Sequence, residues 1–558
     1  MKSIIKSFSD HGTFVQPDTL RYVLSKDNPQ EFASFVIQNL KEYPLVLTLD
    51  QIKTIEQETK EEQTPIYTTT LVGGKALQKK VLSTVYGGEL PITVPSEENE
   101  LEYDDPDKDD QIELPSEDAR EVETPKVIEI KTVKGWKPKA REYDSEVCIL
   151  KDITGNSTCE GTTKDFTKLF VDRYSALRKL LQTQRRELAN VMPINRIKRN
   201  GVKDLQLIGI VKDVKTTVNG HRIIELEDET GVATAIVLKT NLEAMQLANE
   251  TILDEIIGIR GQLSKNGDLI IIHSVIFPDI SIQNERHKAE VPVYAAFLSD
   301  IHIGSNTFMN DEWNSFLKWI NGNLGSSRQK DVASKIKYLV FPGDLVDGIG
   351  IYPGQEKELS IVNLYEQYES LAKQIELIPD HISMILQPGN HDAVRPAEPQ
   401  PTFEKEIQSL FSGKEFIFVG NPCYFSLHGV ELLSYHGVSL LDFSTNIQSL
   451  NYNQPTEVMK VMLKKRHIAP IYGGYTPLAP EHLDHMVIDR VPDIFVTGHV
   501  HTASIDNYRG VTLINASAWQ AQTSYQKMLN FVPDSGKLPI VDLKTGNVTM
   551  MDFSKKFS

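Results

Sequence analysis

The sequence is short of cysteine and of long apolar runs. Its 558 residues include three cysteines, Cys148, Cys159 and Cys423, without CxxC or CxxxxC spacing. An odd, sparse set of thiols argues against a disulfide framework and against a cysteine-based zinc site, and it is typical of a reducing cytoplasm. The first twenty residues contain no apolar core of a signal peptide, and no run of about 20 apolar residues predicts a membrane helix. We therefore expect a cytoplasmic protein that does not enter a membrane.

Negative charge is abundant but unevenly distributed. The net charge is −17, yet residues 97–123 hold fourteen acidic residues against Lys108 and Arg120, a local charge of −12. The remainder of the chain carries only −5, so the overall charge does not argue against a nucleic-acid partner. Pro106, Pro115 and a scarcity of apolar residues predict a disordered linker in this segment. The alternative is an acidic docking strip for a basic partner.

Length and periodicity predict several domains. At about 150 residues per domain, a chain of this length holds three or four. Apolar residues at helical spacing, such as Phe32, Val36 and Leu40, predict a small N-terminal helical module. A second amphipathic helix starts at Asp165, and its basic residues form either a solvated face or a nucleic-acid contact. The predicted domains are a helical module (1–75), a flexible acidic linker (76–144), a helical connector (145–200), a barrel (201–288) and an α/β domain (289–558).

Residues 204–283 change to the periodicity of strands. Five apolar runs are separated by the turn sequences Asn219-Gly220, Thr230-Gly231 and Asn266-Gly267. Five short strands in about 80 residues predict a small barrel, of which the OB-fold is the commonest kind. These strands lack interleaved aromatic residues for base stacking, which favours docking or positioning as the function of the barrel. Direct binding of a single nucleic-acid strand is the alternative.

The α/β domain carries polar residues directly after its apolar runs. Five such runs each end in Asp, Asn or His. In α/β proteins, sites lie beyond the carboxyl ends of the strands. The polar blocks, in chain order, are Asp300-Ile301-His302, Gly343-Asp344, Gly389-Asn390-His391-Asp392, His436 and Gly498-His499-Val500-His501.

These blocks have the residue types that a pair of divalent cations requires, namely a bridging carboxylate with oxygen and imidazole ligands around it. Alternation along a strand places Asp300 and His302 on one side, and it places the two histidines of the last block together in the same way. Asp344 is the best candidate for the bridge. Asn390 offers a neutral oxygen ligand, which leaves His391 free to act as an acid. Mixed nitrogen and oxygen ligands favour Mn²⁺, with Fe²⁺ or Zn²⁺ as alternatives, over Mg²⁺.

In type and order, the blocks resemble the calcineurin-like metallophosphoesterase superfamily, whose pattern is D-x-H, G-D, G-N-H-D or G-N-H-E, a later H, and G-H-x-H. The resemblance implies an α/β metallophosphoesterase sandwich with two metal ions. The ligands implied for one ion are Asp300, His302, Asp344 and His501. Those implied for the other are Asp344, Asn390, His436 and His499. His391 would lie over the leaving group, oriented by Asp392.

A barrel directly before such a domain resembles the small, B-type subunits of replicative DNA polymerases. The stretches Asp152-Ile153-Thr154-Gly155, Asp172-Arg173-Tyr174 and RHIAPIYGG (466–474) are similar to the small subunits of archaeal D-family DNA polymerases. The resemblance covers the chain from about residue 145 onward. The loop that begins with Arg466-His467 either approaches a substrate phosphate or is structural.

This resemblance implies a proofreading exonuclease that hydrolyses DNA from 3′ to 5′. The implied partners are the large catalytic subunit of the polymerase, in a heterodimer or larger assembly, and DNA with single-stranded or mismatched 3′ ends. A sliding clamp is a further candidate partner. The alternatives are a non-catalytic scaffold for the large subunit and a stand-alone repair nuclease of the same superfamily.

Overall fold

The computed structural model describes residues 136–199, 204–282, 284–528 and 530–555, and, nearer the N-terminus, residues 8, 14–15, 17–24, 26, 29–40, 46–48, 51–53, 55, 66–72 and 75–81. The chain divides into two compact units, Met1–Ser116 and Glu117–Ser558, each of which is described by itself. None of the helices in these described parts combines the length and apolar composition needed to cross a membrane.

The first unit contains two short helices, α2 (Pro17–Leu24) and α3 (Pro29–Asn39), whose apolar faces share a small core that includes Val23 and Val36. Both helices lie within the range of the predicted helical module, residues 1–75. Strand β1 (Phe14–Val15) pairs in parallel with β2 (Val46–Leu47). A hairpin of β3 (Ile66–Val72) and β4 (Lys75–Val81) crosses the predicted boundary at residue 75. The acidic segment 97–123 lies outside the described residues.

The second unit contains the predicted barrel. Its five strands close in the order β10-β8-β7-β6-β9, so the prediction of a small five-stranded barrel is confirmed. The Asn219-Gly220 turn joins the first two strands, with Gly220 at a φ of 79° that favours glycine. Helix α6 (Leu242–Asn249), capped by Asn241, lies between the third and fourth strands and was not predicted. The barrel strands are β6 (Leu205–Thr216), β7 (Arg222–Asp228), β8 (Gly231–Val237), β9 (Ile256–Leu263) and β10 (Ile270–Ile276).

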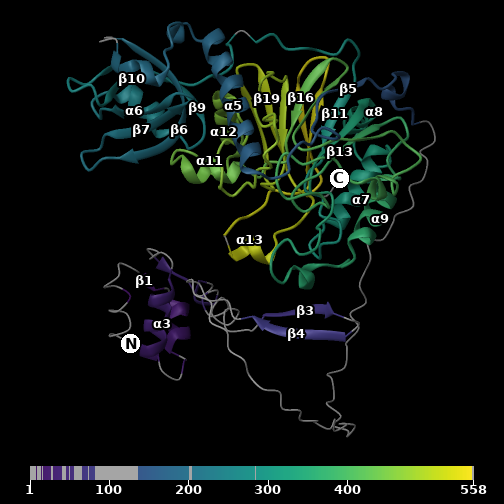
Figure 1. Cartoon of the computed structure of the whole chain (residues 1–558). Coiled ribbons are helices and arrows are strands. Elements are labelled where there is room, and N and C mark those ends of the chain that lie inside the picture. Colours follow the sequence, from purple (N-terminus) through teal and green to yellow (C-terminus); the bar gives the residue numbers. More distant parts are fainter. Residues whose placement is uncertain are drawn as a thin grey trace, which may run out of the picture. The chain divides into compact units, whose positions relative to one another are not determined.

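The remainder of this unit is built on two six-stranded sheets (Figure 1). The first has the order β14-β13-β12-β11-β20-β21, with β11 to β14 parallel; these strands are β11 (Tyr294–Phe297), β12 (Ile336–Pro342), β13 (Ser383–Gln387), β14 (Phe416–Phe418), β20 (Lys537–Asp542) and β21 (Val548–Asp552). The second has the order β18-β19-β17-β16-β15-β5; these strands are β5 (Val147–Lys151), β15 (Cys423–Leu427), β16 (Val430–Ser434), β17 (Ile494–Thr497), β18 (Ala503–Tyr508) and β19 (Val511–Ala516). The domain is therefore mixed α/β, as predicted.

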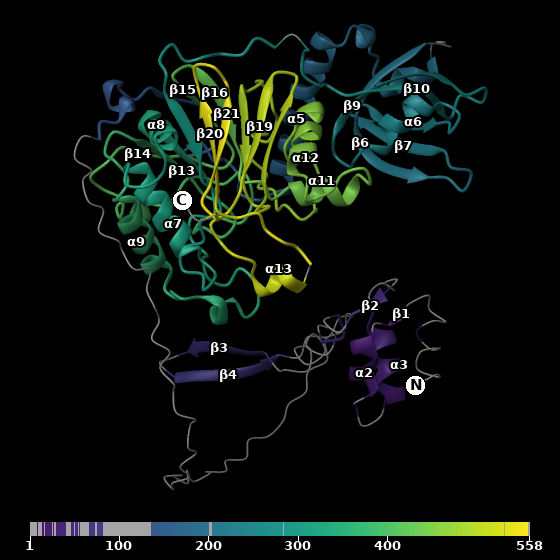
Figure 2. The same ribbon diagram turned by 180° about the vertical axis from the view of Figure 1, so that it is seen from behind.

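A buried apolar core joins the two sheets, with Phe297 and Val340 from the first and Leu432 and Val496 from the second. A second core packs helices against the first sheet, and a third packs helices against the second sheet (Figures 1 and 2). Helices on the first sheet are α7 (Asn310–Ile320), α8 (Ser327–Lys335) and α9 (Leu364–Ile375); those on the second are α11 (Leu440–Asn446) and α12 (Pro455–Lys465). Two short helices, α10 (Lys405–Gln408) and α13 (Ser524–Met528), lie in connecting segments.

The predicted helical connector contains one long helix and also a strand. Helix α5 (Thr163–Gln184) confirms the amphipathic helix, and Thr162 and Asp165 cap it reciprocally. Its apolar stripe is buried at Tyr174, Leu177 and Leu181. Strand β5, however, pairs with β15 and so belongs to the second sheet of the α/β domain. In the rest of this segment, as far as residue 199, the regular elements are two short 3₁₀ turns, η2 (Arg186–Leu188) and η3 (Ile194–Arg199). A further turn, η1 (Lys139–Glu142), precedes the segment.

Candidate metal centre

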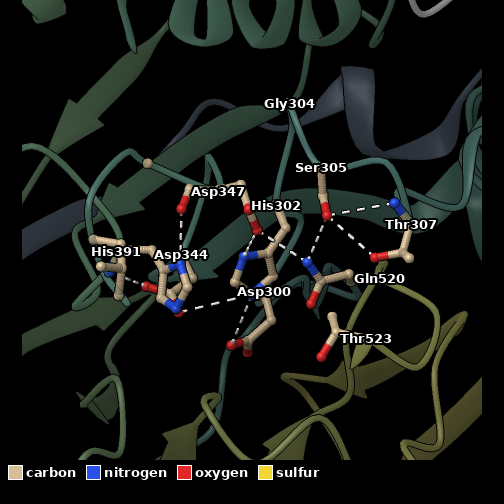
Figure 3. Close-up of polar contacts among 12 residues, drawn as sticks. Asp300, His302, Gly304, Ser305, Thr307, Asp344, Asp347, His391, Gln520 and Thr523 are labelled. Atoms are coloured by element: carbon tan, nitrogen blue, oxygen red, sulfur yellow. Dashed lines mark hydrogen bonds and ion pairs between the residues drawn. The ribbon is translucent and has the colours of Figure 1, made fainter. Parts of the chain in front are cut away.

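The five polar blocks converge because their strands end at one edge of the sandwich. Asp300 and His302 follow β11, Asp344 follows β12, and Asn390 and the residue after it follow β13 of the first sheet. His436 follows β16, and the last block follows β17 of the second sheet. Figure 3 shows Asp300, His302 and Asp344 directed toward one another, with His391 beside them.

Among the described residues, three groups of three side chains gather their ligand atoms within 4.8 Å of one another. Two consist of predicted ligands: Asp300, His302 and His501 form the first group, and Asp344, His436 and His499 form the second. The third joins His302 to Asp347 and His391. Within the first group, His501 Nε2 lies 3.3 Å from Asp300 Oδ1. Asp344 connects the groups, because its Oδ2 lies 3.2 Å from His436 Nε2 and 3.8 Å from His302 Nε2. Asn390 Oδ1 lies 3.0 Å from His436 Nε2. All seven predicted ligands are therefore close together, with Asp344 in the position of a bridge.

The chemistry of these donors fits bound cations. His302 Nε2 faces His501 Nε2 at 3.2 Å, an arrangement in which two imidazole nitrogens need a shared proton or cation between them. Asp300 Oδ1 is buried and accepts no hydrogen bond of good geometry, and its ion-pair neighbours are the rings of His501 (3.3 Å) and His302 (3.9 Å). A buried carboxylate is costly unless a cation or a protonated imidazole compensates its charge. The observed donors thus fit a pair of divalent ions.

The ionisable groups of the centre shift one another's pKa values. Burial alone would raise the pKa of Asp344, but His436 and His391 outweigh burial and hold that pKa well below its usual range. Burial would lower the pKa of His436, yet Asp344 raises it to about 10. Burial lowers the pKa of His499 to about 3, so its imidazole is neutral and can act as a ligand.

The backbone at the centre is held in a sparsely populated conformation. Five of the seven predicted ligands have positive φ: Asp300 (53°), His302 (53°), Asp344 (52°), His499 (68°) and His501 (54°). Each such residue costs on the order of 1–3 kcal/mol, and such strain gathers at functional sites. Hydrogen bonds from the Asp300 amide to the Gly343 carbonyl (3.1 Å) and from the His499 amide to Asp300 Oδ2 (2.8 Å) hold these conformations.

Glycines next to the ligands allow a close approach. A Cβ at Gly389 would collide with Asp344 Oδ1, and one at Gly498 would collide with Ser299 Oγ and Asp300 Oδ2. These two positions therefore require glycine because the carboxylates lie directly against the backbone.

Comparisons with known proteins identify the family. The chain matches the family model for the B subunits of DNA polymerases alpha and epsilon over residues 295–506, which contain all seven predicted ligands. It is 41% identical to the DNA polymerase II small subunit of Methanocaldococcus jannaschii over 407 residues, or 72% of this chain and 68% of the relative. The corresponding protein of Methanothermobacter thermautotrophicus is 42% identical, over 75% of this chain and 84% of the relative. The corresponding protein of Archaeoglobus fulgidus is 43% identical, over 70% of this chain and 78% of the relative.

The chain belongs to the family of DNA polymerase II small subunits. The predicted relationship to the small subunits of archaeal D-family DNA polymerases is thereby confirmed.

Asp347 also belongs to the centre of this polymerase small subunit, although it was not predicted from the sequence. Its Oδ1 lies 2.9 Å from His302 Nδ1, and its carbonyl oxygen lies 2.8 Å from His391 Nδ1. Gln520 donates one hydrogen bond to Asp347 Oδ1 and another to Ser305 Oγ, both 2.9 Å long (Figure 3). The sequence feature that could have indicated Asp347 is its position, three residues after Asp344 in the same strand-end loop.

Asp392 does not have the orienting role that was predicted for it. Its carboxylate accepts hydrogen bonds from the amides of Leu345 (3.1 Å) and Gly389 (2.9 Å) and from the hydroxyl of Tyr368 (2.9 Å). Burial and the nearby Asp344 raise the pKa of Asp392 to about 7. It therefore joins two strand-end loops, and the Asp347 carbonyl is the group that orients His391.

The side chains of Arg466 and His467, at the start of the 466–474 loop, have structural roles. Arg466 is buried, and its guanidinium donates hydrogen bonds to the carbonyl oxygens of Ile488 (2.6 Å) and Asp489 (3.0 Å). His467 Nε2 lies 2.9 Å from a carboxylate oxygen of Asp484. Because these polar groups are already paired inside the protein, the side chains of Arg466 and His467 are not available for a phosphate contact.

A cavity of about 490 Å³ opens over the centre. Its floor includes His302, Asp344, Asn390, His391 and His499. No lysine or arginine is among its described lining residues. Attraction of a phosphate to this cavity therefore depends on histidines and on whatever cations the ligands hold.

Proposed function

We propose that this small subunit is a two-metal phosphodiesterase that removes nucleotides from the 3′ ends of DNA. The observation that carries the proposal is the position of Asp344, whose carboxylate lies within 4 Å of a histidine of each ligand group. A shared carboxylate between two such groups is the arrangement of two-metal phosphoesterases.

The fold supports assignment of the two domains as an OB-fold and a calcineurin-like sandwich. Along the barrel, strands occur in the order first, second, third, fifth and fourth, with the helix between the third and fourth. This order agrees with a five-stranded Greek-key barrel of the OB kind, which supports the assignment. The sandwich holds its ligands at the ends of strands from both sheets, which agrees with the motif pattern of the calcineurin-like superfamily.

Two ions are expected at the centre, with Mn²⁺ favoured and Fe²⁺ or Zn²⁺ as alternatives for these nitrogen and oxygen ligands. One would be held by Asp300, His302, Asp344 and His501, and the other by Asp344, Asn390, His436 and His499. When bound, such ions supply Lewis acidity toward a phosphate and lower the pKa of bound water.

His391 is proposed to donate a proton to the departing 3′ oxygen. A carbonyl oxygen only accepts hydrogen bonds, so contact with the Asp347 carbonyl places a proton on His391 Nδ1. Nε2 is then the nitrogen that exchanges a proton with the substrate. His391 lines the cavity and belongs to neither of the two groups that contain Asp300 or Asp344, although it also lies near His302 and Asp347. We therefore assign it the role of an acid rather than that of a ligand.

The relatives are named as small subunits of DNA polymerase II. We therefore propose that the partner of this chain is the large subunit that carries polymerisation, and that the substrate is a single-stranded or mismatched 3′ end presented by it. The same assembly gives the protein a second role as a scaffold for the large subunit.

The test compares the wild-type chain with Asp344→Asn, alone and with the large subunit, on a 5′-labelled single strand with Mn²⁺. We expect a ladder that shortens from the 3′ end, abolished by chelation and by Asp344→Asn. Asp311→Asn, an exposed aspartate of α7, is the matched control and should keep wild-type activity. Elemental analysis should find two ions per chain in the wild type. Cleavage by Asp344→Asn at the wild-type rate, or shortening from the 5′ end, would overturn the proposal.

A further inference from the structure

Four aromatic side chains line the same cavity as the metal centre. They come from separate segments: Tyr352 after β12, Tyr452 between α11 and α12, Tyr525 in α13, and Phe531 after it. Helix α13 lies beyond the ends of both sheets (Figures 1 and 2). All four rings thus face the cavity, although Tyr452 and Phe531 also pack against the core of the second sheet.

The rings form two pairs. Tyr352 and Tyr525 are stacked, with centroids 6.1 Å apart and planes 20° apart. Tyr452 and Phe531 lie 6.5 Å apart at 57°. Tyr525 is 51% exposed, although it is a large aromatic side chain next to a buried centre. One face of Tyr525 is therefore supported by Tyr352, and the ring still offers surface to a ligand.

This pair is positioned before any ligand arrives. The Tyr352 hydroxyl donates a hydrogen bond to Glu358 (3.3 Å). The segment that carries Tyr525 is closed by its own hydrogen bonds, from the Phe531 amide to the Gln526 carbonyl (2.9 Å) and from Gln522 to the Phe531 carbonyl (2.6 Å). A preformed aromatic surface loses little conformational entropy when it binds.

Apart from the metal centre, the described lining of the cavity offers neutral polar side chains and no cationic ones with which to hold a nucleotide. No lysine or arginine is among its described lining residues, so ionic contacts to the phosphate backbone are few. Base stacking on aromatic rings is the sequence-tolerant way in which proteins hold single strands. It needs a free face of the base, which a paired and stacked base inside a duplex does not offer.

We propose that Tyr525, supported by Tyr352, is a stacking platform for the base of the 3′-terminal nucleotide. The platform makes an unpaired terminal base the preferred substrate, so selection of frayed or mismatched ends resides in this chain. The inference rests on the proposed 3′ exonuclease, and it adds the group of the substrate that is recognised and the residue that recognises it.

The test combines an enzyme variant with a substrate variant. The substrates are a 5′-labelled strand with a normal 3′-terminal nucleotide and the same strand with an abasic one. The variant is Tyr525→Leu, which keeps apolar bulk and removes the aromatic face. Tyr365→Leu is the matched control, because Tyr365 is 54% exposed and does not line the cavity.

In the wild type, loss of the terminal base should lower kcat/KM by about 5–100-fold, the usual worth of one stacked base. Tyr525→Leu should lower kcat/KM on the normal strand by a similar factor and leave the abasic strand almost unchanged. Tyr365→Leu should behave as the wild type on both. If Tyr525→Leu lowers kcat/KM equally on the two strands, so that the normal-to-abasic ratio of kcat/KM stays at its wild-type value, the platform is overturned.

A second readout separates the platform from the nuclease. If wild-type protein hydrolyses neither strand with Mn²⁺, the proposed function fails, and binding then tests the platform. A strand with a 3′-terminal 2-aminopurine should lose fluorescence on binding to the wild type and to Tyr365→Leu, because stacking quenches this base. Quenching by Tyr525→Leu as strong as that by the wild type would reject the platform whatever the outcome for hydrolysis.

Discussion

At the scale of single residues, the centre depends on side chains that lie against strained backbone. Asp344 has a φ of 52° and receives the His391 amide at Oδ1 (2.9 Å), while its Oδ2 faces His436 and His302. One carboxylate thus fixes the position of the proposed acid and faces both ligand groups. Substitution of Asp344 is expected to affect every part of the site, whereas substitution of His391 affects one step.

Replacement of His391 by alanine tests that separation. His391→Ala should still bind two metal ions and DNA, while the rate falls by about 10²–10⁴-fold, the usual worth of a general acid. The defect should shrink on a p-nitrophenyl phosphodiester, because this leaving group departs without a proton. His499→Ala, which removes a proposed ligand, should show no such recovery.

Rates on both substrates, together with elemental analysis, decide this prediction. Loss of a metal ion from His391→Ala, or equal defects on the activated and natural substrates, would mean that His391 is a structural or substrate-binding residue.

The convergence of the polar blocks could be predicted from sequence, but the groups that support them could not. A polar block after each apolar run is a local signal, and parallel strands carry such blocks to one edge. Asp392 was misassigned because adjacency to His391 in sequence does not set its direction; its carboxylate turns back to the Gly389 and Leu345 amides. The contact of Gln520 with Asp347 joins residues 173 positions apart and leaves no pattern in the sequence.

At the scale of elements, one buried acid helps to hold the connector to the α/β domain. Glu481 accepts hydrogen bonds from the Ser157 hydroxyl (2.6 Å) and the Thr158 amide (2.5 Å), and it pairs with Arg395 (2.7 Å). This anchor holds the segment between β5 and α5. Strand β5 escaped prediction because it is a partly exposed edge strand of five residues, whose burial depends on β15, far away in sequence.

Glu481→Gln should weaken this anchor in a pH-dependent manner. Burial alone would raise the pKa of Glu481, but hydrogen bonds from Ser157 and Thr158 and the pairing with Arg395 lower it from 4.5 to about 2. A lowered folded-state pKa stabilises the protein above the unfolded-state value, and this stabilisation disappears as pH falls from about 4.5 to about 2. At pH 7 the substitution should cost up to about 3 kcal/mol.

Urea unfolding at a series of pH values measures this difference in free energy of unfolding between wild type and variant. The difference should be largest above pH 5 and shrink below pH 4.5. Glu404→Gln, at an exposed position before α10, should match the wild type throughout. A difference that does not change with pH would show that the amide disturbs packing rather than charge.

At the scale of the whole molecule, most of the net negative charge lies in a segment of the sequence that contributes no residue to the candidate metal centre. Residues 97–123 account for −12 of the net −17 and lie outside the described residues. Their composition predicts a solvated tether. Deletion of residues 97–123 should therefore leave the melting temperature of the second unit and hydrolysis of short strands almost unchanged.

Calorimetry and the strand-shortening assay check this deletion. A large loss of folded protein would mean that the segment packs against something and that the composition was misleading.

Barrel and sandwich are fastened by charged groups that are themselves buried. Arg173 of α5 pairs with Asp484 at 2.6 Å and also donates hydrogen bonds to the carbonyl oxygens of Asp254, which precedes β9 of the barrel, and Pro470. Lys465 of α12 pairs with Glu255 at 2.6 Å. The sequence identified Arg173 and the loop that contains Pro470 as shared motifs. That these residues hold the barrel and the sandwich together could be recognised only from their contacts in the structure.

The Arg173 contact gives the last prediction. Burial would raise the pKa of Asp484, but Arg173 and His467 hold it well below its usual range, so Asp484 is ionised and needs its partner. Arg173→Met keeps much of the volume and leaves this buried carboxylate without its main partner, which should cost about 3–5 kcal/mol. Urea unfolding should also split into two transitions if the barrel separates first. Lys179→Met, exposed on the same helix, is the control. Arg173→Met/Asp484→Asn should regain part of the loss, because neither charge then remains buried alone; a single variant as stable as the wild type would show that the pair does not fasten the domains.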